Sequence, residues 1–387
     1  ASPVPITGHR EGFDASELAE LELVEVPHVE ALTPERAAFN RCLRKAMPPD
    51  NGAWVERPFE RVAKCSAFGE QVPKVYIGYK RLAQIYLPSL QHYPNETIDN
   101  KKRYLKESIE RFIVPMCRIN NYNHQIYEEK DPSVKWDPHA FMEAMAGKHL
   151  LFMGDSVLRQ FLHSLACALA EAGYHAQRML MSVKVEVELQ YENGFKLSKW
   201  TMLDLKPWNR VYLTQQLQEA DVVFLNMGHH YHFMNLTSKY QPDTQTLMNL
   251  LATSDTPVVL MESNAAHFPT ISGDFHDPRR REEWSTSQRD RGKFPCMQVP
   301  NVKEKTVNER NRLFVGAADR LGFPVLPVFG LTAPRWDAHQ GWYGFGLERR
   351  RKPDCLHYCY SPAMFEPIAA RIQRIAAAAI HECDSSA

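Results

Sequence analysis

The amino-acid sequence predicts an α/β fold: a doubly wound, mostly parallel sheet flanked by helices, with an irregular N-terminal segment that covers it. The first observation is that, beyond Trp136, short apolar runs alternate with amphipathic stretches of helical length. Apolar runs without polar alternation are typical of parallel strands, which are buried on both faces. The second observation is the regular strand–helix order, which favours right-handed crossovers and helices on both faces of one sheet.

The start of this region predicts a strand, a helix and a hairpin. Residues 149–153 form the first apolar run. Apolar side chains then recur at helical spacing as far as Leu169, which predicts an amphipathic helix. Within residues 183–203, two strand-like stretches flank Asn193-Gly194, the dipeptide most typical of a tight hairpin turn.

The remainder predicts three more buried strands and three helices. The strands are expected at residues 222–225, 258–261 and 325–329, and the helices around residues 244–251, 303–321 and 364–380. Parallel strands of such a sheet end at one edge, and ligands bind beyond those carboxyl ends. A functional site is therefore expected there.

We divide the chain into three parts. Residues 1–40 are acidic and punctuated by proline, and they predict a flexible N-terminal arm. Residues 41–132 are irregular, contain three cysteines and predict a covering segment with disulfides and one helix over residues 99–112. Residues 133–384 hold the α/β pattern and predict the domain that carries the functional site.

The overall charge is balanced, since Lys+Arg and Asp+Glu both total 46. No net field draws this chain to nucleic acid or to an anionic membrane, so a neutral or mixed-charge partner is expected. No apolar run approaches the length of a membrane span. The sequence starts without Met and without a signal pattern, from which we expect a processed or trimmed terminus.

Cysteines and glycosylation motifs favour the secretory pathway. There are eight cysteines, an even number, and none forms a zinc-type Cys-x-x-Cys pair. Asn95 and Asn235 begin Asn-x-Thr sequons. Together they favour a lumenal or secreted protein with up to four disulfides. A cytosolic protein with eight free thiols is the alternative that these observations leave open.

Gly154-Asp155-Ser156 lies directly between the first predicted strand and its helix. A serine there sits at the carboxyl edge of the sheet, and its N–H belongs to the helix N-terminus, where it can stabilise an oxyanion. Gly154 allows a sharp turn, and Asp155 suits the helix end. The tripeptide alone is equally compatible with a simple helix cap.

A nucleophilic serine needs a base and an acid that orients the base. Asp354 and His357, near the C-terminus, supply both within a short loop that follows the last predicted strand. Asp337 and His339 form a rival pair with two-residue spacing. We favour Asp354 and His357, because their segment should lie at the same edge of the sheet as the serine.

A third polar stretch, residues 226–232, follows the second parallel strand and contains three histidines. A metal site is the less favoured interpretation, because no carboxylate or cysteine stands at ligand spacing. We expect instead that Asn226, Gly228 and His229 line the site and help to stabilise an oxyanion. His267, beyond the third strand, is a further candidate for the rim of the site.

Five blocks, in order, resemble the PC-esterase domain of trichome-birefringence-like proteins, an SGNH/GDSL-like family. The matching blocks are Gly147 to Ser156 with the residues through Arg159 and Leu169, then Asn226-x-Gly228-His229, Ala266-His267-Phe268, Arg335-x-Asp337-x-His339 to Tyr343, and Asp354-Cys355-Leu356-His357-Tyr358-Cys359. The resemblance covers roughly residues 136–375. Departures include Gln160-Phe161 in place of Asn-Gln and the loss of several tryptophans, which indicate a distant relative.

The resemblance implies an SGNH-like fold and a Ser156–His357–Asp354 triad, and it makes Asp337 and His339 a structural or substrate-side element. Arg159 and His267 are further candidates for contact with the oxyanion or the substrate. It further implies a Golgi-lumenal or secreted glycoprotein that O-acetylates a glycan or polysaccharide through an acetyl-serine. Such an enzyme binds no cofactor but needs an acetyl donor, either acetyl-CoA or an acetylated intermediate, and a membrane protein can supply that donor. A carbohydrate acetylesterase and an inactive glycan-binding protein are the alternatives.

Overall fold

The computed structural model describes the α/β region and parts of the segment before it. The described residues are 29, 31–48, 52–56, 125–180, 187–231, 236–271, 273–275, 277, 296–298, 309–343, 352–358 and 362–383. The predicted helix over residues 99–112 and the sequons at Asn95 and Asn235 lie outside the described residues.

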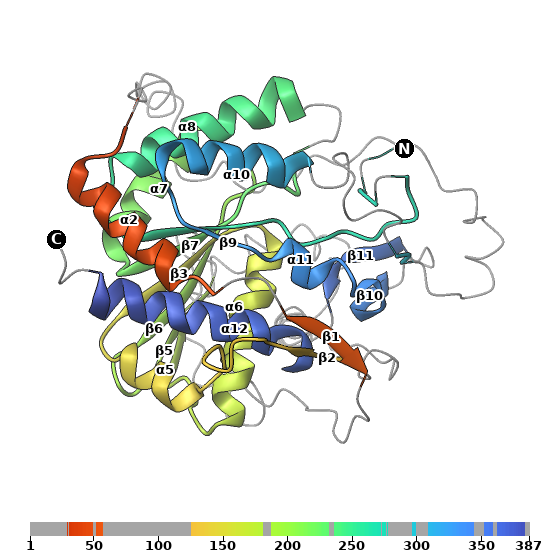
Figure 1. Cartoon of the computed structure of the whole chain (residues 1–387), viewed down its shortest axis with the longest axis horizontal. Coiled ribbons are helices and arrows are strands. Elements are labelled where there is room, and N and C mark those ends of the chain that lie inside the picture. The colour runs from red at the N-terminus through yellow and green to blue at the C-terminus, as the bar shows by residue number, and fades with distance from the viewer. Residues whose placement is uncertain are drawn as a thin grey trace, which may run out of the picture.

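A seven-stranded mixed sheet forms the centre of the protein (Figure 1). Its strand order is β4-β5-β6-β3-β7-β8-β9. The strands are β3 (His149–Gly154), β4 (Arg178–Leu180), β5 (Val187–Gln190), β6 (Lys196–Thr201), β7 (Val222–Leu225), β8 (Val258–Met261) and β9 (Val325–Leu326). β6, β3, β7, β8 and β9 run parallel, whereas β4 and β5 are antiparallel to their neighbours. The predicted α/β class and the hairpin around residues 193–194 are confirmed.

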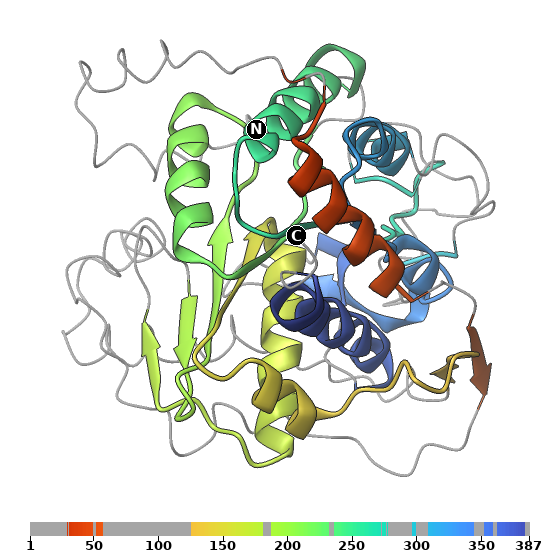
Figure 2. The same cartoon turned by 60° about the vertical axis from the view of Figure 1, so that its left-hand side comes forward.

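Helices cover both faces of this sheet (Figures 1 and 2). One apolar cluster joins the sheet to α5 (Pro138–Ala144), α6 (Ser156–Glu171) and α12 (Pro362–Ala377). The other joins the opposite face to α7 (Pro207–Glu219), α8 (Gln241–Ala252) and α10 (Glu309–Leu321). Short helical turns complete the chain: η3 (Leu236–Tyr240), α11 (Phe329–Thr332), η4 (Trp336–Ala338) and η5 (Ala378–Glu382). The layered arrangement buries strand β3 completely.

The end of the predicted flexible arm is helical. Helix α2 (Pro34–Ala46) begins within residues 1–40 and crosses the expected boundary at residue 40. Thr33 caps the helix, and the Arg36 guanidinium donates to the carbonyl oxygens of Asp255 and Thr256 at 3.0 and 2.6 Å. A disulfide joins Cys42 to Cys383. Tertiary contacts therefore order a stretch whose composition predicted flexibility.

A small antiparallel pair from the predicted covering segment packs beside the α/β layers. Strand β1 (Ala53–Glu56) pairs with β2 (Gln125–Glu128). The indole N–H of Trp54 donates to the carbonyl oxygen of Leu331 at 3.0 Å, and the Arg335 guanidinium stacks over its ring at 4.4 Å. β1 and β2 thus lie against the loop that precedes β10 (His339–Tyr343).

Two sequence expectations about strands were wrong. The run at 325–329 yields a strand of only two residues, because Phe329 already starts α11, and the Glu262 carboxylate accepts from the N–H groups of Val328 and Phe329. The Asp354 segment, expected as a loop, is strand β11 (Lys352–Tyr358). It pairs antiparallel with β10 as a separate two-stranded sheet.

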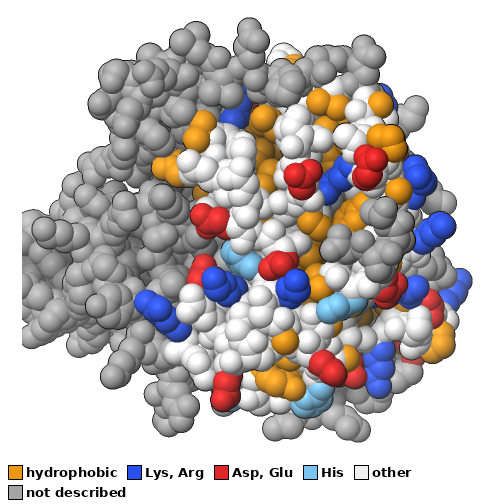
Figure 3. All heavy atoms as spheres, turned by 90° about the vertical axis from the view of Figure 1, so that its left-hand side faces the viewer, with side chains coloured by type: hydrophobic (Ala, Val, Ile, Leu, Met, Phe, Trp, Pro, Cys, Tyr) orange, Lys and Arg blue, Asp and Glu red, His pale blue; other side chains and the backbone are white. Residues whose placement is uncertain are grey.

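Two disulfides are described, Cys42–Cys383 and Cys296–Cys355. Disulfides are consistent with a lumenal or secreted protein. Among the described residues, no helix has the length and apolar character needed to cross a membrane. The face in Figure 3 carries positive and negative side chains interspersed, in keeping with the balanced total charge.

Candidate active site

Ser156 is the first residue of α6, and only Asp155 separates it from the end of β3. Asp155 caps the helix, and its Oδ1 accepts from the N–H of Val157 at 2.9 Å. The first N–H groups of any helix lack an intrahelical acceptor, and the N–H of Ser156 is one of these groups, which in other helices bind anions. The Ser156 side chain is half-buried.

Gly154 is required here by close packing. A Cβ atom at this position would lie 2.5 Å from the carbonyl oxygen of Asn226 and 2.8 Å from Cδ1 of Leu158. Strands β3 and β7 are hydrogen-bonded neighbours. Gly154 and Asn226 directly follow the last residues that pair between them, Met153 and Leu225. The absence of a side chain at residue 154 thus lets the two loops that leave β3 and β7 approach each other beside Ser156.

His357 and Asp354 reach Ser156 from strand β11. Ser156 Oγ lies 2.6 Å from His357 Nε2, and His357 Nδ1 lies 2.9 Å from Asp354 Oδ2. Asp354 Oδ1 also accepts from the backbone N–H of His357 at 3.1 Å. These distances let Asp354 hold the Nδ1–H tautomer, which leaves Nε2 as the proton acceptor that faces Ser156.

The electrostatics of this pair keep the acid ionised. Burial raises the pKa of Asp354, but the hydrogen bond and charge of His357 outweigh that effect and bring the pKa below its ordinary value. Asp354 is therefore a carboxylate at neutral pH. A carboxylate in this position stabilises the imidazolium that forms when His357 accepts a proton.

A bulge in β11 explains how residues three apart act together. Side chains alternate along a strand, so residues i and i+3 normally point to opposite faces. Here His339 pairs with Tyr358, and Gly341 pairs with Asp354. The register therefore advances by two residues on β10 but by four on β11. The extra residues bend β11, and Asp354 Oδ1 caps the bend by accepting from the N–H groups of Leu356 and His357 at 3.3 and 3.1 Å.

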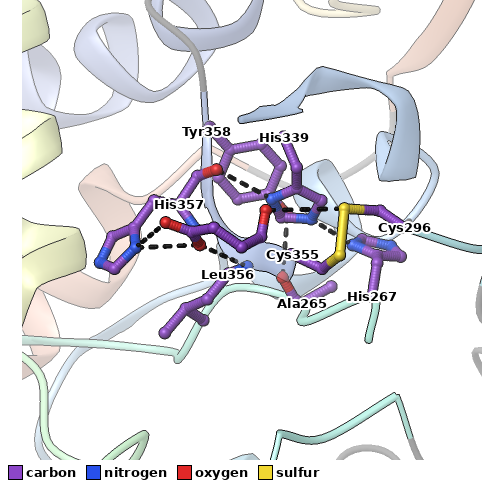
Figure 4. The surroundings of a disulfide bond; sticks show 9 residues. Ala265, His267, Cys296, His339, Cys355, Leu356, His357 and Tyr358 are labelled. Carbon is purple, nitrogen blue, oxygen red and sulfur yellow. Dashed lines mark hydrogen bonds and ion pairs between the residues drawn. A yellow bond between two sulfur atoms is a disulfide. The ribbon is translucent and has the colours of Figure 1, made fainter. Parts of the chain in front are cut away.

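The cysteine between the acid and the base anchors this strand. Cys355 forms a buried disulfide with Cys296. A backbone hydrogen bond also joins β11 to the loop after β8, because the N–H of His267 donates to the carbonyl oxygen of Cys355 at 2.8 Å. Figure 4 shows the disulfide, His267, His339 and Tyr358 gathered beside His357. The strand that holds the candidate base is therefore anchored on the side of the loop that follows β8.

The loop after β7 brings two histidines to Asp155. Nε2 of His229 lies 2.8 Å from Asn264 Oδ1. Burial raises the pKa of Asp155, yet the charges of His229 and His230 together lower it below its ordinary value. In turn, burial lowers the pKa of His229, and Asp155 opposes that shift. The charges of Asp155 and His229 thus stabilise each other between the serine loop and the histidine loop.

Asn226 and Gly228 lie at the same edge of the sheet. The side chain of Asn226 is buried, and its Nδ2 donates to the carbonyl oxygen of Met261 at 3.2 Å and to Ser263 Oγ at 3.3 Å. A Cβ atom at Gly228 would lie 2.8 Å from Ser263 Oγ, so a larger residue there would force Ser263 to move. Both residues therefore pack the loop after β7 against the end of β8.

The two remaining candidates, His267 and Arg159, are placed differently from His357 and Asp354. His267 is fully buried: its Nδ1 lies 2.6 Å from His339 Nε2, and its Nε2 lies 2.8 Å from the carbonyl oxygen of Ala333. It is thus an internal residue and not part of the rim. Arg159 is half-buried and lies almost one turn after Ser156 on α6.

Asp337 and His339, the rival pair, help to support β11. Asp337 binds the buried Arg335 guanidinium, with Arg335 Nε 3.0 Å from Asp337 Oδ1. His339 Nδ1 faces the carbonyl oxygen of His357 at 3.1 Å. Neither side chain contacts Ser156 in the hydrogen bonds of the described residues. Asp354 and His357, which the sequence favours over this pair, are the residues whose contacts lead to Ser156.

Gln160 is the residue at this site that sequence reasoning passed over. Its side chain bonds to both backbone groups of Tyr358, the residue after His357. The available signal was its spacing of four from Ser156, which places both on one side of α6. Within the described residues, no group of three or more His, Cys, Asp or Glu side chains is placed to hold a metal ion.

One comparison bears on the region that contains Ser156. A scan against protein families matches residues 134–206 to PC-Esterase, described as a GDSL/SGNH-like acyl-esterase family found in Pmr5 and Cas1p. This match supports the chain as a distant member of the PC-esterase family, and it supports acyl-ester chemistry in general. It includes Ser156 and ends before His357 and Asp354.

The other comparisons are less informative. A search of curated proteins finds no match. Four chains of solved structures match. One of them aligns with 58% of this chain and 95% of its own length, at 11% identity and a TM-score of 0.30. A likeness of that size carries no argument about fold or function.

Proposed function

We propose that this protein is a glycan or polysaccharide O-acetyltransferase that works through Ser156, His357 and Asp354. The observation that carries the proposal is the continuous chain of contacts from Ser156 Oγ to His357 Nε2 and from His357 Nδ1 to Asp354, at 2.6 and 2.9 Å. Aligned contacts of this kind activate a serine for attack on a carbonyl carbon.

The reaction runs in two displacements. His357 takes the proton of Ser156 Oγ while Oγ attacks the acetyl carbonyl carbon of the donor. The donor's leaving group departs with the proton from His357, which leaves acetyl-Ser156. A sugar hydroxyl then gives its proton to His357 and attacks the acetyl carbon, and Ser156 Oγ recovers the proton as the acetylated sugar leaves.

The oxyanion of each tetrahedral intermediate needs hydrogen-bond donors. The N–H of Ser156, at the start of α6, is one candidate. The loop that contains Asn226, Gly228 and His229 can supply others. No bound cofactor takes part in this scheme; the acetyl donor is acetyl-CoA or an acetylated intermediate delivered by a membrane protein. The proposed place of action is the Golgi lumen or the cell exterior.

The test of the nucleophile is Ser156→Ala. We expect this variant to lose at least about 10³-fold in acetyl transfer from p-nitrophenyl acetate and to resist a serine-directed phosphonate, because no other group can form the acyl intermediate. The matched control is Ser164→Ala, the same substitution at a buried serine on the same helix. Near-normal turnover of Ser156→Ala would overturn the assignment.

A carbohydrate acetylesterase is the second candidate. The description of the matching family as an acyl-esterase family favours it, and both reactions use the same three residues. Acetate release from p-nitrophenyl acetate, measured with and without a panel of neutral oligosaccharides, separates them. Acetate release that no sugar alters indicates an esterase, whereas acetylated sugar in the mass spectrum indicates a transferase.

A catalytically inactive glycan-binding protein is the third candidate. The contacts among Ser156, His357 and Asp354 count against it, since a binding site does not need an activated serine. Phosphonate labelling at Ser156 would reject this candidate. Sugar binding without labelling would favour it.

A further inference from the structure

The side-chain amide of Gln160 pairs with a backbone peptide of strand β11. Its Nε2 donates to the carbonyl oxygen of Tyr358 at 2.6 Å, and its Oε1 accepts from the N–H of Tyr358 at 3.0 Å. The side chain is buried, with 7% of its surface exposed. The amide thus does what a neighbouring strand would do, because it satisfies both polar groups of one residue.

This pairing connects the two parts of the protein that carry the nucleophile and the base. Gln160 lies four residues after Ser156 on α6, so the two side chains are neighbours on one face of the helix. Tyr358 directly follows His357 on β11. Gln160 therefore lies one helical turn from the nucleophile, and its hydrogen-bond partner is the residue next to the base.

The other contacts of β11 hold it from a different side. His339 lies against the carbonyl oxygen of His357, and the hydroxyl of Tyr358 donates to the carbonyl oxygen of Ala265 at 2.9 Å. The Cys296–Cys355 disulfide is also on that side. These contacts join β11 to the loop after β8, to β10 and to the segment of Cys296, and none of them fixes its distance from α6.

From this geometry we infer that Gln160 is a positioning residue, whose amide holds β11 against α6 at the separation that lets His357 reach Ser156. The inference rests on the proposed function, in which His357 is the base. Displacement of reacting groups by about 1 Å can cost about 10²-fold in rate. Removing the amide also leaves two buried backbone groups of Tyr358 without partners, so β11 is expected to shift until they find new ones.

The experiment compares Gln160→Met with Asn193→Leu. Met keeps the length of Gln without its hydrogen bonds. Asn193 also uses a side-chain amide to bond backbone groups, those of Met142 and Phe195, but it lies beyond the opposite end of β3 from Ser156. The readouts are thermal unfolding, the rate of phosphonate labelling at Ser156, and kcat and KM for p-nitrophenyl acetate.

We expect both variants to unfold at lower temperature, but only Gln160→Met to label at least about tenfold more slowly. Its kcat should fall by a similar factor with KM unchanged, because the amide acts on the base and not on the substrate. Labelling of Gln160→Met at the wild-type rate would overturn the inference and leave Gln160 a purely structural residue.

A second variant, Gln160→Asn, tests the inference if Gln160→Met does not fold. Gln160→Asn keeps the amide but shortens the side chain by one methylene, so it should also label more slowly than the wild type. Labelling at the wild-type rate by folded Gln160→Asn would contradict the inference equally. Failure of the proposed function is a separate outcome: Ser156→Ala would then react like the wild type, whatever happens at residue 160.

Discussion

Replacing His267 with glutamine is expected to flatten the acid dependence of the protein's stability. Burial lowers the pKa of His267 from 6.5 to about 4, while the histidine of an unfolded chain keeps its ordinary pKa. Between these two pH values the unfolded chain binds more protons than the folded protein. The free energy of unfolding therefore falls as the pH is lowered through this window.

The size of this effect follows from the two pKa values. Each pH unit between them corresponds to about 1.4 kcal/mol, so His267 accounts for a loss of about 3 kcal/mol between pH 6.5 and pH 4. His339, whose pKa burial and the charge of His267 also lower, acts in the same direction. A protein with a typical stability of about 5–15 kcal/mol would lose a large part of it by pH 4.

The assay is urea unfolding, followed by tryptophan fluorescence at a series of pH values from 7.5 to about 4. His267→Gln keeps a donor for the carbonyl oxygen of Ala333 but cannot titrate, so the slope against pH should fall by about one proton, or about 1.4 kcal/mol per pH unit. His381→Gln is the matched control, because the exposed His381 contacts the carbonyl oxygen of Ala144 in a similar way. An unchanged slope in His267→Gln would refute the reasoning.

Three further sets of substitutions test the packing beside Ser156, an ion pair and a disulfide. Gly154→Ala should lower the free energy of unfolding by about 1–3 kcal/mol in urea and slow phosphonate labelling of Ser156, because its Cβ would overlap the carbonyl oxygen of Asn226. The control is Gly316→Ala on α10, whose Cβ would meet nothing within 4 Å and should not destabilise the protein. Equal effects of the two substitutions would contradict this prediction. Arg371→Met should cost about 3–5 kcal/mol in the same assay, because it removes the buried guanidinium that pairs with half-buried Glu129, and adding Glu129→Gln should recover part of the loss. No recovery would count against the pair. Replacing Cys42 and Cys383 with serine should lower the free energy of unfolding by about 2–4 kcal/mol, with labelling of Ser156 retained; loss of labelling would show that α2 supports the site directly.

The sequence predicted the β3–α6 unit well, because local signals there agree with one another. An unbroken apolar run makes residues 149–153 a buried strand, and apolar spacing makes the next stretch a helix. The place of Ser156 between them follows directly. The strands at 222–225 and 258–261 could be predicted for the same reason, since their runs are buried on both faces.

Strand β11 could not be predicted, because its pairing is not local. Basic residues and Pro353 precede Asp354, a composition typical of loops. The segment becomes a strand through its pairing with β10 and its disulfide to Cys296. His267 misled the prediction in a related way: a histidine beyond a strand is well placed for a rim, but contact with His339 turns its ring into the interior.

The position of the base outside the main sheet has a consequence for how the site is built. Ser156 needs only β3 and α6, which one apolar core fixes. His357 stands on a two-stranded sheet whose register shifts beside it, so the geometry of the sheet alone does not set its place. The disulfide, the buried histidines and Gln160 each supply a constraint that a regular strand would not need. The rate of reaction at Ser156 should therefore be more sensitive to changes in these supports than to changes of similar destabilising effect within the seven-stranded sheet.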